Sequence, residues 1–246
     1  MSFFYIEEEY DLNFFCALGN AYEIKKYRGR SKVANIPNLY NGTPGEYPVV
    51  KIGNGAFYKK QIEVIIIPDN IQEIGRNAFS CCHHLKELNI GKGLTKIGEK
   101  AFYRCTTLES IAIDNDNPVF FSRDDNGNYN IIATKEDGKL LYGCKNSSIP
   151  EGIKEISAGA FYECKDLKQI VIPEGVRVIG KEAFNNCQQL IRAYLPGTLE
   201  NVDRYIFKNC GKLKLVQFNG TAEKWGRLRI WNYGFVVNCT DNVIKP

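Results

Sequence analysis

Cysteine is a reactive side chain that recurs at a fixed spacing in this sequence. Cys82, Cys105, Cys164, Cys187 and Cys210 each lie three residues after a phenylalanine. If the chain coils so that these positions stack, neighbouring thiols lie on strands or coils about 4.8 Å apart, which is within reach of a disulfide. A repeated inward position instead favours a ladder of small buried thiols that pack as apolar side chains. We therefore predict free, buried cysteines, with disulfide bridging as the alternative.

A cluster of possible metal ligands overlaps this ladder. Cys81, Cys82, His83 and His84 are consecutive and include both histidines of the chain. Four adjacent residues cannot surround one tetrahedral zinc ion, because zinc ligand pairs need intervening residues. Cys82 is also required by the buried ladder. We predict that this segment binds no metal.

Two acidic segments, residues 114–118 and 124–128, offer oxygen ligands of the kind that calcium prefers. A calcium loop needs regularly alternating ligands, a glycine at the sixth position and a final glutamate, and Gly127 does not fit that spacing. Turn formation by Asp, Asn and Gly is the favoured interpretation. The sequence has no Gly-x-Ser-x-Gly motif and no phosphate-binding loop. We expect no cofactor and no catalysis; a pair of carboxylates in a cleft is the alternative.

Composition limits the class of protein. The 246 residues are 44% hydrophobic, enough for a substantial core, and 32 basic against 28 acidic residues give a net charge of +4. These charges are interspersed, so the sequence shows no nucleic-acid-binding footprint. No apolar run approaches the roughly 20 residues of a membrane span. Acidic residues at positions 7–9 and 11 interrupt the N-terminal apolar residues, which is not the pattern of a secretory signal.

The elements that position these residues are repeats. Apolar residues that end short apolar segments recur in steps of 23, 23, 36, 23, 23 and 23 residues, and Ile36 fits an earlier, irregular turn. A second ladder of phenylalanines follows the same period. The first ladder is Ile67, Ile90, Ile113, Ile149, Ile172, Leu195 and Phe218; the second is Phe57, Phe79, Phe102, Phe161, Phe184 and Phe207.

Each repeat predicts a short strand followed by tight turns. The LxxIxI segments alternate with period two, which is typical of a half-buried strand. GxxAFxxC is too short for a long helix and fits one helical turn or tight turns that direct Phe and Cys inward. We predict six parallel strands in one curved sheet, at residues 62–67, 85–90, 108–113, 167–172, 190–195 and 213–218. One such unit buries too little apolar surface to fold alone, so the repeats must stack.

The combined pattern LxxIxIPxxVxxIGxxAFxxC resembles the BspA-like, treponemal-type leucine-rich repeat family over residues 30–220. This resemblance implies a curved solenoid with a parallel sheet on its concave face. It also implies proteins displayed on microbial surfaces, where they act in adhesion or partner binding. The predicted fold class is an α/β solenoid: a right-handed leucine-rich-repeat coil with a concave parallel β-sheet, short helical turns on the convex side, and caps at both ends.

We predict a single domain over residues 1–246. Residues 1–35 form an N-terminal cap with a hairpin turned at Gly19-Asn20, residues 36–218 form the repeats, and residues 219–246 form a C-terminal cap. In that cap, Thr221 begins a short helix, and Trp225 and Trp231 seal the open end of the coil; a ligand site at the tryptophans is the alternative. The 36-residue step predicts a β-hairpin near 118–147, turned at Asp137-Gly138, that projects from the coil.

The outward positions of the strands form the candidate binding surface on the concave face. Arg192, Tyr194, Leu215 and Gln217 make its most promising part, because Arg and Tyr are enriched in binding hot spots. A solvated sheet face without a partner is the plain alternative. The whole candidate set is Val64, Ile66, Glu87, Asn89, Ser110, Ala112, Asp114, Gln169, Val171, Arg192, Tyr194, Leu215 and Gln217.

The function expected from the resemblance is a non-catalytic binding module, a microbial surface or secreted adhesion protein that binds a protein or glycan partner. An intracellular interaction scaffold of the same fold is the alternative, which the lack of a recognisable signal in this sequence favours, and an enzyme is a remote third. We expect a monomer with no nucleic-acid partner.

Overall fold

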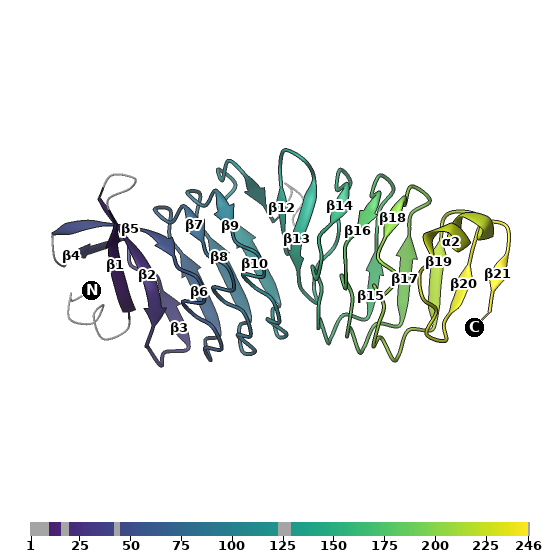
Figure 1. Cartoon of the computed structure of the whole chain (residues 1–246), viewed down its shortest axis with the longest axis horizontal. Helices are drawn as coiled ribbons and strands as arrows, with labels where there is room; N and C mark the ends of the chain where they lie inside the picture. Colours follow the sequence, from purple (N-terminus) through teal and green to yellow (C-terminus); the bar gives the residue numbers. More distant parts are fainter. Residues whose placement is uncertain (1–9, 16–19, 42–44, 123–128, 246) are drawn as a thin grey trace. The chain divides into compact units, whose positions relative to one another are not determined.

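The structure is a computed structural model that describes the whole chain except residues 1–9, 16–19, 42–44, 123–128 and 246. The chain forms two compact units, residues 1–120 and 121–246. Within each unit, short strands follow one another coil after coil along the chain (Figure 1). Each unit is therefore a stack of β-solenoid coils.

In the first unit, the three predicted repeat strands and one strand that was not predicted, β3, form a four-stranded sheet in the order β10-β8-β6-β3. All neighbours pair in parallel without a register shift, so Val64 lies beside Glu87 and Glu87 beside Ser110. Burial alternates along each strand, as the period-two pattern predicts. The strands are β3 (Val33–Asn35), β6 (Val64–Ile67), β8 (Glu87–Ile90) and β10 (Ser110–Ile113).

A second sheet of the first unit begins with the predicted N-terminal hairpin, whose strands β1 and β2 pair antiparallel. Most of its turn lies outside the described residues. β2 also pairs in parallel with β5, so the hairpin is continuous with the coil stack. The sheet has the order β1-β2-β5-β7-β9, with β4 beside β5. Its strands are β1 (Tyr10–Phe15), β2 (Ala21–Tyr27), β4 (Leu39–Asn41), β5 (Glu46–Ile52), β7 (Glu73–Ile74) and β9 (Lys96–Ile97).

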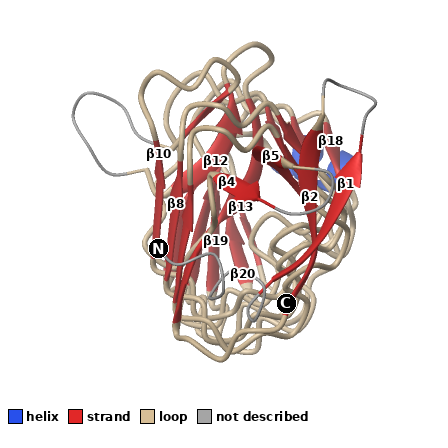
Figure 2. Cartoon of the chain, turned by 90° about the vertical axis from the view of Figure 1, so that its left-hand side faces the viewer, coloured by secondary structure: helices blue, strands red, loops and turns tan. Residues whose placement is uncertain are grey.

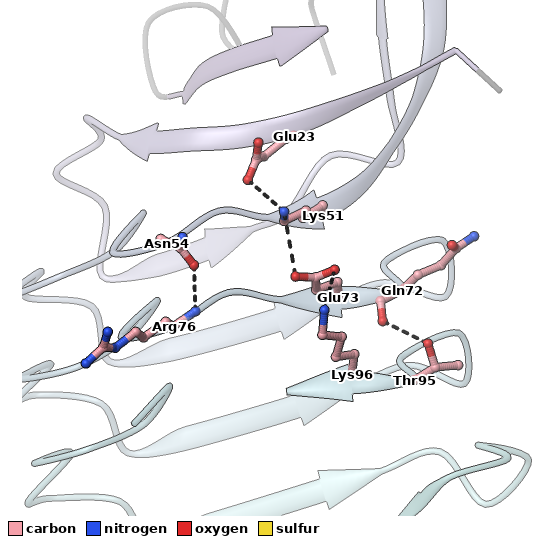
Figure 3. A network of polar contacts seen from close by, with 8 residues as sticks. All are labelled: Glu23, Lys51, Asn54, Gln72, Glu73, Arg76, Thr95 and Lys96. Carbon is pink, nitrogen blue, oxygen red and sulfur yellow. Dashed lines mark hydrogen bonds and ion pairs between the residues drawn. The ribbon is translucent and has the colours of Figure 1, made fainter. Parts of the chain in front are cut away.

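Charges of alternating sign cross this second sheet (Figure 3). The Lys51 ammonium lies 3.4 Å from a carboxylate oxygen of Glu23 and 3.6 Å from one of Glu73. The other Glu73 oxygen lies 3.5 Å from the ammonium of Lys96. Like charges on adjacent strands would repel, so this Glu-Lys-Glu-Lys order favours the observed register over a one-coil slip.

The remaining predicted repeat strands lie in the second unit, in a sheet ordered β15-β17-β19-β20-β21. The six strands thus belong to two hydrogen-bonded sheets rather than the single sheet that we predicted. Ile149 is buried, but residues 147–150 adopt irregular backbone and form no strand. The strands are β15 (Gln169–Val171), β17 (Arg192–Leu195), β19 (Leu215–Phe218), β20 (Val236–Asn238) and β21 (Val243–Ile244).

The other sheet of the second unit contains the insertion. β12 and β13 form the predicted antiparallel hairpin, but the prediction that it projects from the coil is wrong. β13 pairs in parallel with β14 of the coil stack. Ile131, Ala133 and Leu140 are fully buried in the core. The strands, in sheet order, are β11 (Phe120–Phe121), β12 (Ile131–Thr134), β13 (Lys139–Gly143), β14 (Glu155–Ile156), β16 (Val178–Ile179) and β18 (Asn201–Val202).

The GxxAFxxC segments are turns, not the predicted helical turns. A helix requires each backbone N–H to bond four residues back, whereas the N–H of Phe79 donates to the Ala101 carbonyl of the next coil at 2.8 Å. Asn77 and Cys81 have φ angles of 53° and 62°, outside the helical region. In the described part of the chain, helix is confined to α2 (Ala222–Leu228), shown in blue in Figure 2.

The core of each unit is built on stacked phenylalanine rings, as the second ladder predicts. All six are at most 4% exposed. In the first unit the ring centres of Phe57 and Phe79 are 4.9 Å apart, and in the second those of Phe161 and Phe184 are 5.1 Å apart. Tyr27 extends the first stack, with its ring centre 4.8 Å from that of Phe57. Sequence reasoning missed Tyr27, because it lies outside the 23-residue period.

The C-terminal segment confirms the predicted helix. The Thr221 hydroxyl accepts a hydrogen bond from the Lys224 N–H at 3.2 Å and so caps α2. Trp225 is buried against Phe218, with ring centres 5.5 Å apart. Trp231 is 56% exposed, so the prediction that it seals the core is wrong. No helix in the described residues is long and apolar enough to cross a membrane.

Candidate binding surface

The outward residues of the second unit form a regular grid, which we call the C-terminal strip. Arg192 lies beside Leu215 on the neighbouring strand, and Tyr194 lies beside Gln217. On the other side of β17, Gln169 pairs with Arg192 and Val171 with Tyr194. Strands in a sheet are about 4.8 Å apart, so these side chains share one continuous face. The strip comprises Gln169, Val171, Arg192, Tyr194, Leu215, Gln217, Val236 and Asn238.

The parallel strands explain why this face combines apolar and polar groups. Side chains alternate between the two faces of a strand, and the inward residues Ile170, Ala193 and Val216 are nearly or fully buried. The outward positions carry no packing requirement and can differ from coil to coil. Val171 is 52% exposed, beside the phenol of Tyr194. An exposed valine next to an arginine and a tyrosine offers an apolar contact area with directional hydrogen bonding at its border.

The outward residues of the first unit form a second grid, the N-terminal strip. Its members pair across β3, β6, β8 and β10, and the apolar ones lie toward β3. Val33 and Ile66 are 41% and 42% exposed. The strip comprises Val33, Asn35, Val64, Ile66, Glu87, Asn89, Ser110 and Ala112.

A groove of about 540 Å³ lies where the N-terminal strip ends, lined by Ile66, Asn89, Ala112 and Asp114 among others. Asp114 was predicted as part of the strip, but it follows the last residue of β10. Its carboxylate accepts a hydrogen bond from the Asp116 N–H at 2.8 Å. It therefore lies at the rim of the groove within a turn, not on the sheet face.

Residues 114–118 form the turn that we favoured over a calcium loop. Asn117 is fully buried, and its amide nitrogen donates to the carbonyl of Leu94 at 2.9 Å. Its side-chain oxygen accepts from the N–H groups of Val119 and Phe120 at 2.9 and 2.8 Å. Asn117 thereby joins this turn to the preceding coil. Residues 124–128, the second acidic segment, lie outside the described residues.

The cysteine ladder has a bonding role that sequence reasoning missed. The thiol of Cys82 donates to the Phe57 carbonyl at 3.1 Å, and that of Cys187 donates to the Phe161 carbonyl at 3.1 Å. Cys105 and Cys210 make the same bond to Phe79 and Phe184. The repeated interval of 25 or 26 residues between Phe and the later Cys is the signal that could have revealed it. Every cysteine in the described residues is a thiol outside any disulfide.

Burial makes these thiols poor nucleophiles and poor metal ligands. Desolvation raises the pKa of Cys82 to about 12 and also raises that of Cys164. Its thiol hydrogen bond to Phe57 directs Cys82 away from a shared metal with its neighbours. Within the described ranges, no three His, Cys, Asp or Glu side chains are grouped so that they could hold a metal ion.

An ion-pair ladder lies along the edge of the N-terminal strip, one residue before β6. The Glu63 carboxylate lies 2.7 Å from the Lys32 ammonium and 2.8 Å from that of Lys86. Hydrogen bonds from these two ammonium groups lower the pKa of Glu63 to about 2. The carboxylate is therefore ionised at all physiological pH values, and the edge of the strip carries fixed charges.

The repeats of this chain match a known family of repeat proteins. A model of the BspA type leucine rich repeat region matches residues 48–122 and 139–232 in six copies. The chain belongs to the BspA-type leucine-rich repeat family. The unmatched interval between these two segments, residues 123–138, falls in the insertion that contains β12. A comparison of this BspA-type chain with curated proteins found no match.

Solved bacterial structures share the fold. A leucine-rich repeat protein of Eubacterium ventriosum is 24% identical with a TM-score of 0.60, over 70% of this chain and 46% of that one. This chain thus spans less than half of that relative's length. The T. pallidum leucine rich repeat protein is 20% identical, with a TM-score of 0.50 over 91% of this chain and 94% of that one. The pneumococcal vaccine antigen PcpA is 15% identical, with a TM-score of 0.54 over 87% and 81%.

Proposed function

We propose that this BspA-type chain is a non-catalytic binding module that engages a protein partner through the C-terminal strip. The observation behind the proposal is the register that places Val171 beside Tyr194 and Arg192 beside Leu215 on a hydrogen-bonded sheet. A rigid sheet holds these side chains in place before binding, which lowers the entropy lost on association. Aromatic and arginine side chains contribute most to protein interfaces.

The proposal includes a microbial surface or secreted location, a monomeric chain, and one leucine-rich-repeat domain in which each strip lies on the concave sheet face of its own unit. The family supports an interaction role. The pneumococcal relative is described as a vaccine antigen, a property of that protein, and it shares the fold of this one. Surface labelling of intact cells, with a cytoplasmic protein as reference, tests the location. Labelling no greater than the reference would favour the intracellular scaffold instead.

A charge placed in the strip tests the binding surface. Val171→Asp introduces a carboxylate at the most exposed apolar position of the strip, and Tyr205→Asp is the matched control, since Tyr205 is 39% exposed in a turn. Immobilised variants are compared for quantitative capture of extracellular-matrix proteins and of lysate proteins. We expect Val171→Asp to lose a captured protein that the wild type and Tyr205→Asp both retain. Equal capture by all three proteins would contradict the proposal.

A further inference from the structure

The turns of the first unit contain a recess that the strand strips do not share. The residue after each buried phenylalanine is Tyr58, Ser80 and Tyr103 in three successive coils. The middle coil therefore has a small, buried serine where both neighbours have a tyrosine. The next position repeats the pattern, with Cys81 between Lys59 and Arg104. The middle coil thus carries two small side chains at these positions, and each neighbouring coil carries two large ones. The difference in size produces a slot across the stack.

The dimensions of this slot suit a small ligand. Successive ring centres in the underlying stack are 4.9 and 5.2 Å apart, so the flanking coils are roughly 10 Å apart, twice the spacing of strands in a sheet. The recess has a volume of about 680 Å³, which is within the range of roughly 300–1,000 Å³ for ligand sites. Tyr58 is 48% exposed and is one of the residues that line the recess.

The slot carries an excess of positive charge. Arg76, Lys100 and Arg104 line it, and the Lys59 ammonium lies 5.1 Å from the centre of the Tyr58 ring. Glu99 lies beside two of these cations, with carboxylate oxygens 3.8 Å from the Arg76 Nε and 3.4 Å from the Lys100 Nζ. These side chains are about half exposed or more. Exposed ion pairs are weak, so an incoming carboxylate can compete with Glu99 for both cations.

The backbone of the slot is already fully engaged between coils. The Lys59 N–H donates to the Ser80 carbonyl at 3.0 Å, and the Cys81 N–H donates to the Tyr103 carbonyl at 2.8 Å. A peptide that binds as an added strand needs unpaired backbone groups, and these positions do not provide them. Recognition must instead come from the guanidinium, ammonium and phenol groups. Guanidinium groups bind carboxylates in bidentate fashion, and the flat faces of tyrosines pack against apolar C–H surfaces.

We propose that this slot binds an acidic saccharide, a segment of two or three sugar units that carries carboxylates. The sugar ring packs against Tyr58 and Tyr103, and its carboxylates pair with Arg76, Lys100 and Arg104. The φ angles of Lys100 and Arg104 are 57° and 63°, a conformation that L-residues rarely adopt and that the coil stack fixes here. The coil stack therefore fixes the direction in which the Lys100 and Arg104 side chains leave the backbone. This surface is separate from the C-terminal strip and does not depend on it.

The same positions in the second unit lack this chemistry and supply controls. After Phe161, Phe184 and Phe207 come Tyr162, Asn185 and Lys208, and the next residues are Glu163, Asn186 and Asn209. A single tyrosine replaces the pair, and an acidic residue stands where the first unit has Lys59. Tyr162 matches Tyr58 in the repeat, and Lys181, three residues before Phe184, matches Arg76.

Calorimetric titration of the full chain tests the proposal. The probes are a galacturonic acid trisaccharide, a neutral galactose trisaccharide and a hexaglutamate peptide. We expect the uronate to bind, galactose to bind at least about tenfold more weakly, and the affinity for the uronate to fall several-fold between 50 and 300 mM salt, because the shorter Debye length screens exposed charges. Binding of hexaglutamate but not of the uronate would overturn the proposal in favour of an acidic peptide.

Variants locate the binding within the slot. Tyr58→Ala and Arg76→Gln should each weaken uronate binding by about tenfold, the size of a moderate hot-spot effect. Tyr162→Ala and Lys181→Gln should leave it unchanged. Arg76 is 61% exposed, so Arg76→Gln keeps the fold and tests the slot independently of Tyr58→Ala. No uronate binding by the wild type, or equal affinity in Arg76→Gln and Lys181→Gln, would disprove the proposal.

Discussion

The rings of Phe79 and Phe102 lie parallel, with an angle of 3° between their planes and 5.2 Å between their centres. Stacking follows from the repeat, because both phenylalanines occupy the same position in successive coils, and the Phe57–Phe79 pair stacks in the same way at 27°. Phe79 has a second ring on its other side, that of Phe57 at 4.9 Å. The three rings share one continuous core, so each depends on its neighbours to exclude water.

Removing one ring tests how this stack contributes to stability. Phe79→Ala should lower the free energy of unfolding by about 3–5 kcal/mol, because rings on both sides prevent the cavity from closing. Phe102 is 4% exposed against 0% for Phe79, so Phe102→Ala should lower the free energy of unfolding somewhat less. Urea unfolding followed by circular dichroism measures both, with the exposed Tyr58→Ala as the control. A loss below about 1 kcal/mol for Phe79→Ala, well under that of a buried ring, would show that the stack is not the core.

The thiol ladder predicts a large difference in reactivity between the folded and unfolded chain. A thiol reagent at pH 8 should modify the cysteines of the urea-unfolded, unreduced protein and should spare Cys82 in the folded one. The thiolate is the reactive species, and burial raises the pKa of Cys82 to about 12. Mass spectrometry of labelled peptides identifies the sites. Failure of the unfolded, unreduced chain to react at the ladder cysteines would reveal disulfides instead.

Acid should weaken the ladder around Glu63. The pKa of its carboxyl falls from 4.5 to about 2 on folding, through its hydrogen bonds with Lys32 and Lys86. A lowered pKa means that the folded state favours the charged form, so the contribution is present above pH 4.5 and is lost as the pH falls toward 2. Unfolding curves measured between pH 6 and 2.5 should therefore show a smaller fall in the free energy of unfolding for Glu63→Gln than for the wild type.

A control separates this effect from general acid denaturation. Glu200→Gln removes an exposed carboxylate that lies 3.0 Å from the Arg177 guanidinium in the other unit. Glu200 is 60% exposed and pairs there with one cation, and exposed single ion pairs contribute little to stability, so Glu200→Gln should unfold much as the wild type does over the interval where Glu63→Gln is flatter. Identical slopes in all three proteins would mean that Glu63 is not ion-paired in solution.

The insertion should prove essential for folding of the second unit. Deleting residues 122–138 removes β12 with its buried Ile131 and Ala133, and it leaves Leu140 without part of its core. We expect a marked drop in melting temperature, because buried apolar side chains of this size each stabilise the core by about 1.5–3 kcal/mol. An unchanged melting temperature would restore the prediction of a hairpin outside the stack.

The sequence predicted what the repeat enforces and failed where the repeat is interrupted. The phenylalanine stack and the parallel register of β6, β8 and β10 follow from the 23-residue period, because identical side chains in successive coils must occupy identical environments. Ile149 fits that period but forms no strand, and the inserted hairpin of β12 and β13 stands directly before its segment. Trp231 was misassigned because aromatic composition does not distinguish a sealing side chain from an exposed one. No local pattern could have shown these outcomes.

The candidate surface was partly predictable for the same reason. Alternation in β17 and β19 identified Arg192 and Tyr194 as outward residues and placed Leu215 and Gln217 beside them. Val236 and Asn238 were missed, because β20 lies outside the period and its parallel register with β19 is set by α2 and the segment that follows it. The slot at Ser80 was also missed, since it arises from a difference between repeats, whereas repeat analysis looks for what they share.

The C-terminal strip leads to the last prediction. Replacing Arg192 and Tyr194 together by alanine removes a cation and an aromatic ring from one strand, both on its outward face. Neither side chain belongs to the buried core, whereas Ala193 between them is 1% exposed. The melting temperature should therefore stay within about 2 °C of the wild type, because substitutions outside the core usually change stability by less than about 0.5 kcal/mol.

Affinity for a captured protein partner should fall by about thirtyfold, corresponding to about 2 kcal/mol for hot-spot residues. Surface plasmon resonance with that partner measures the loss, and Lys181→Ala with Asn186→Ala, two turn residues of the same unit, is the matched double control. Wild-type affinity in the strip variant together with loss in the turn variant would place the partner on the turns, and the strip would then be a solvated face.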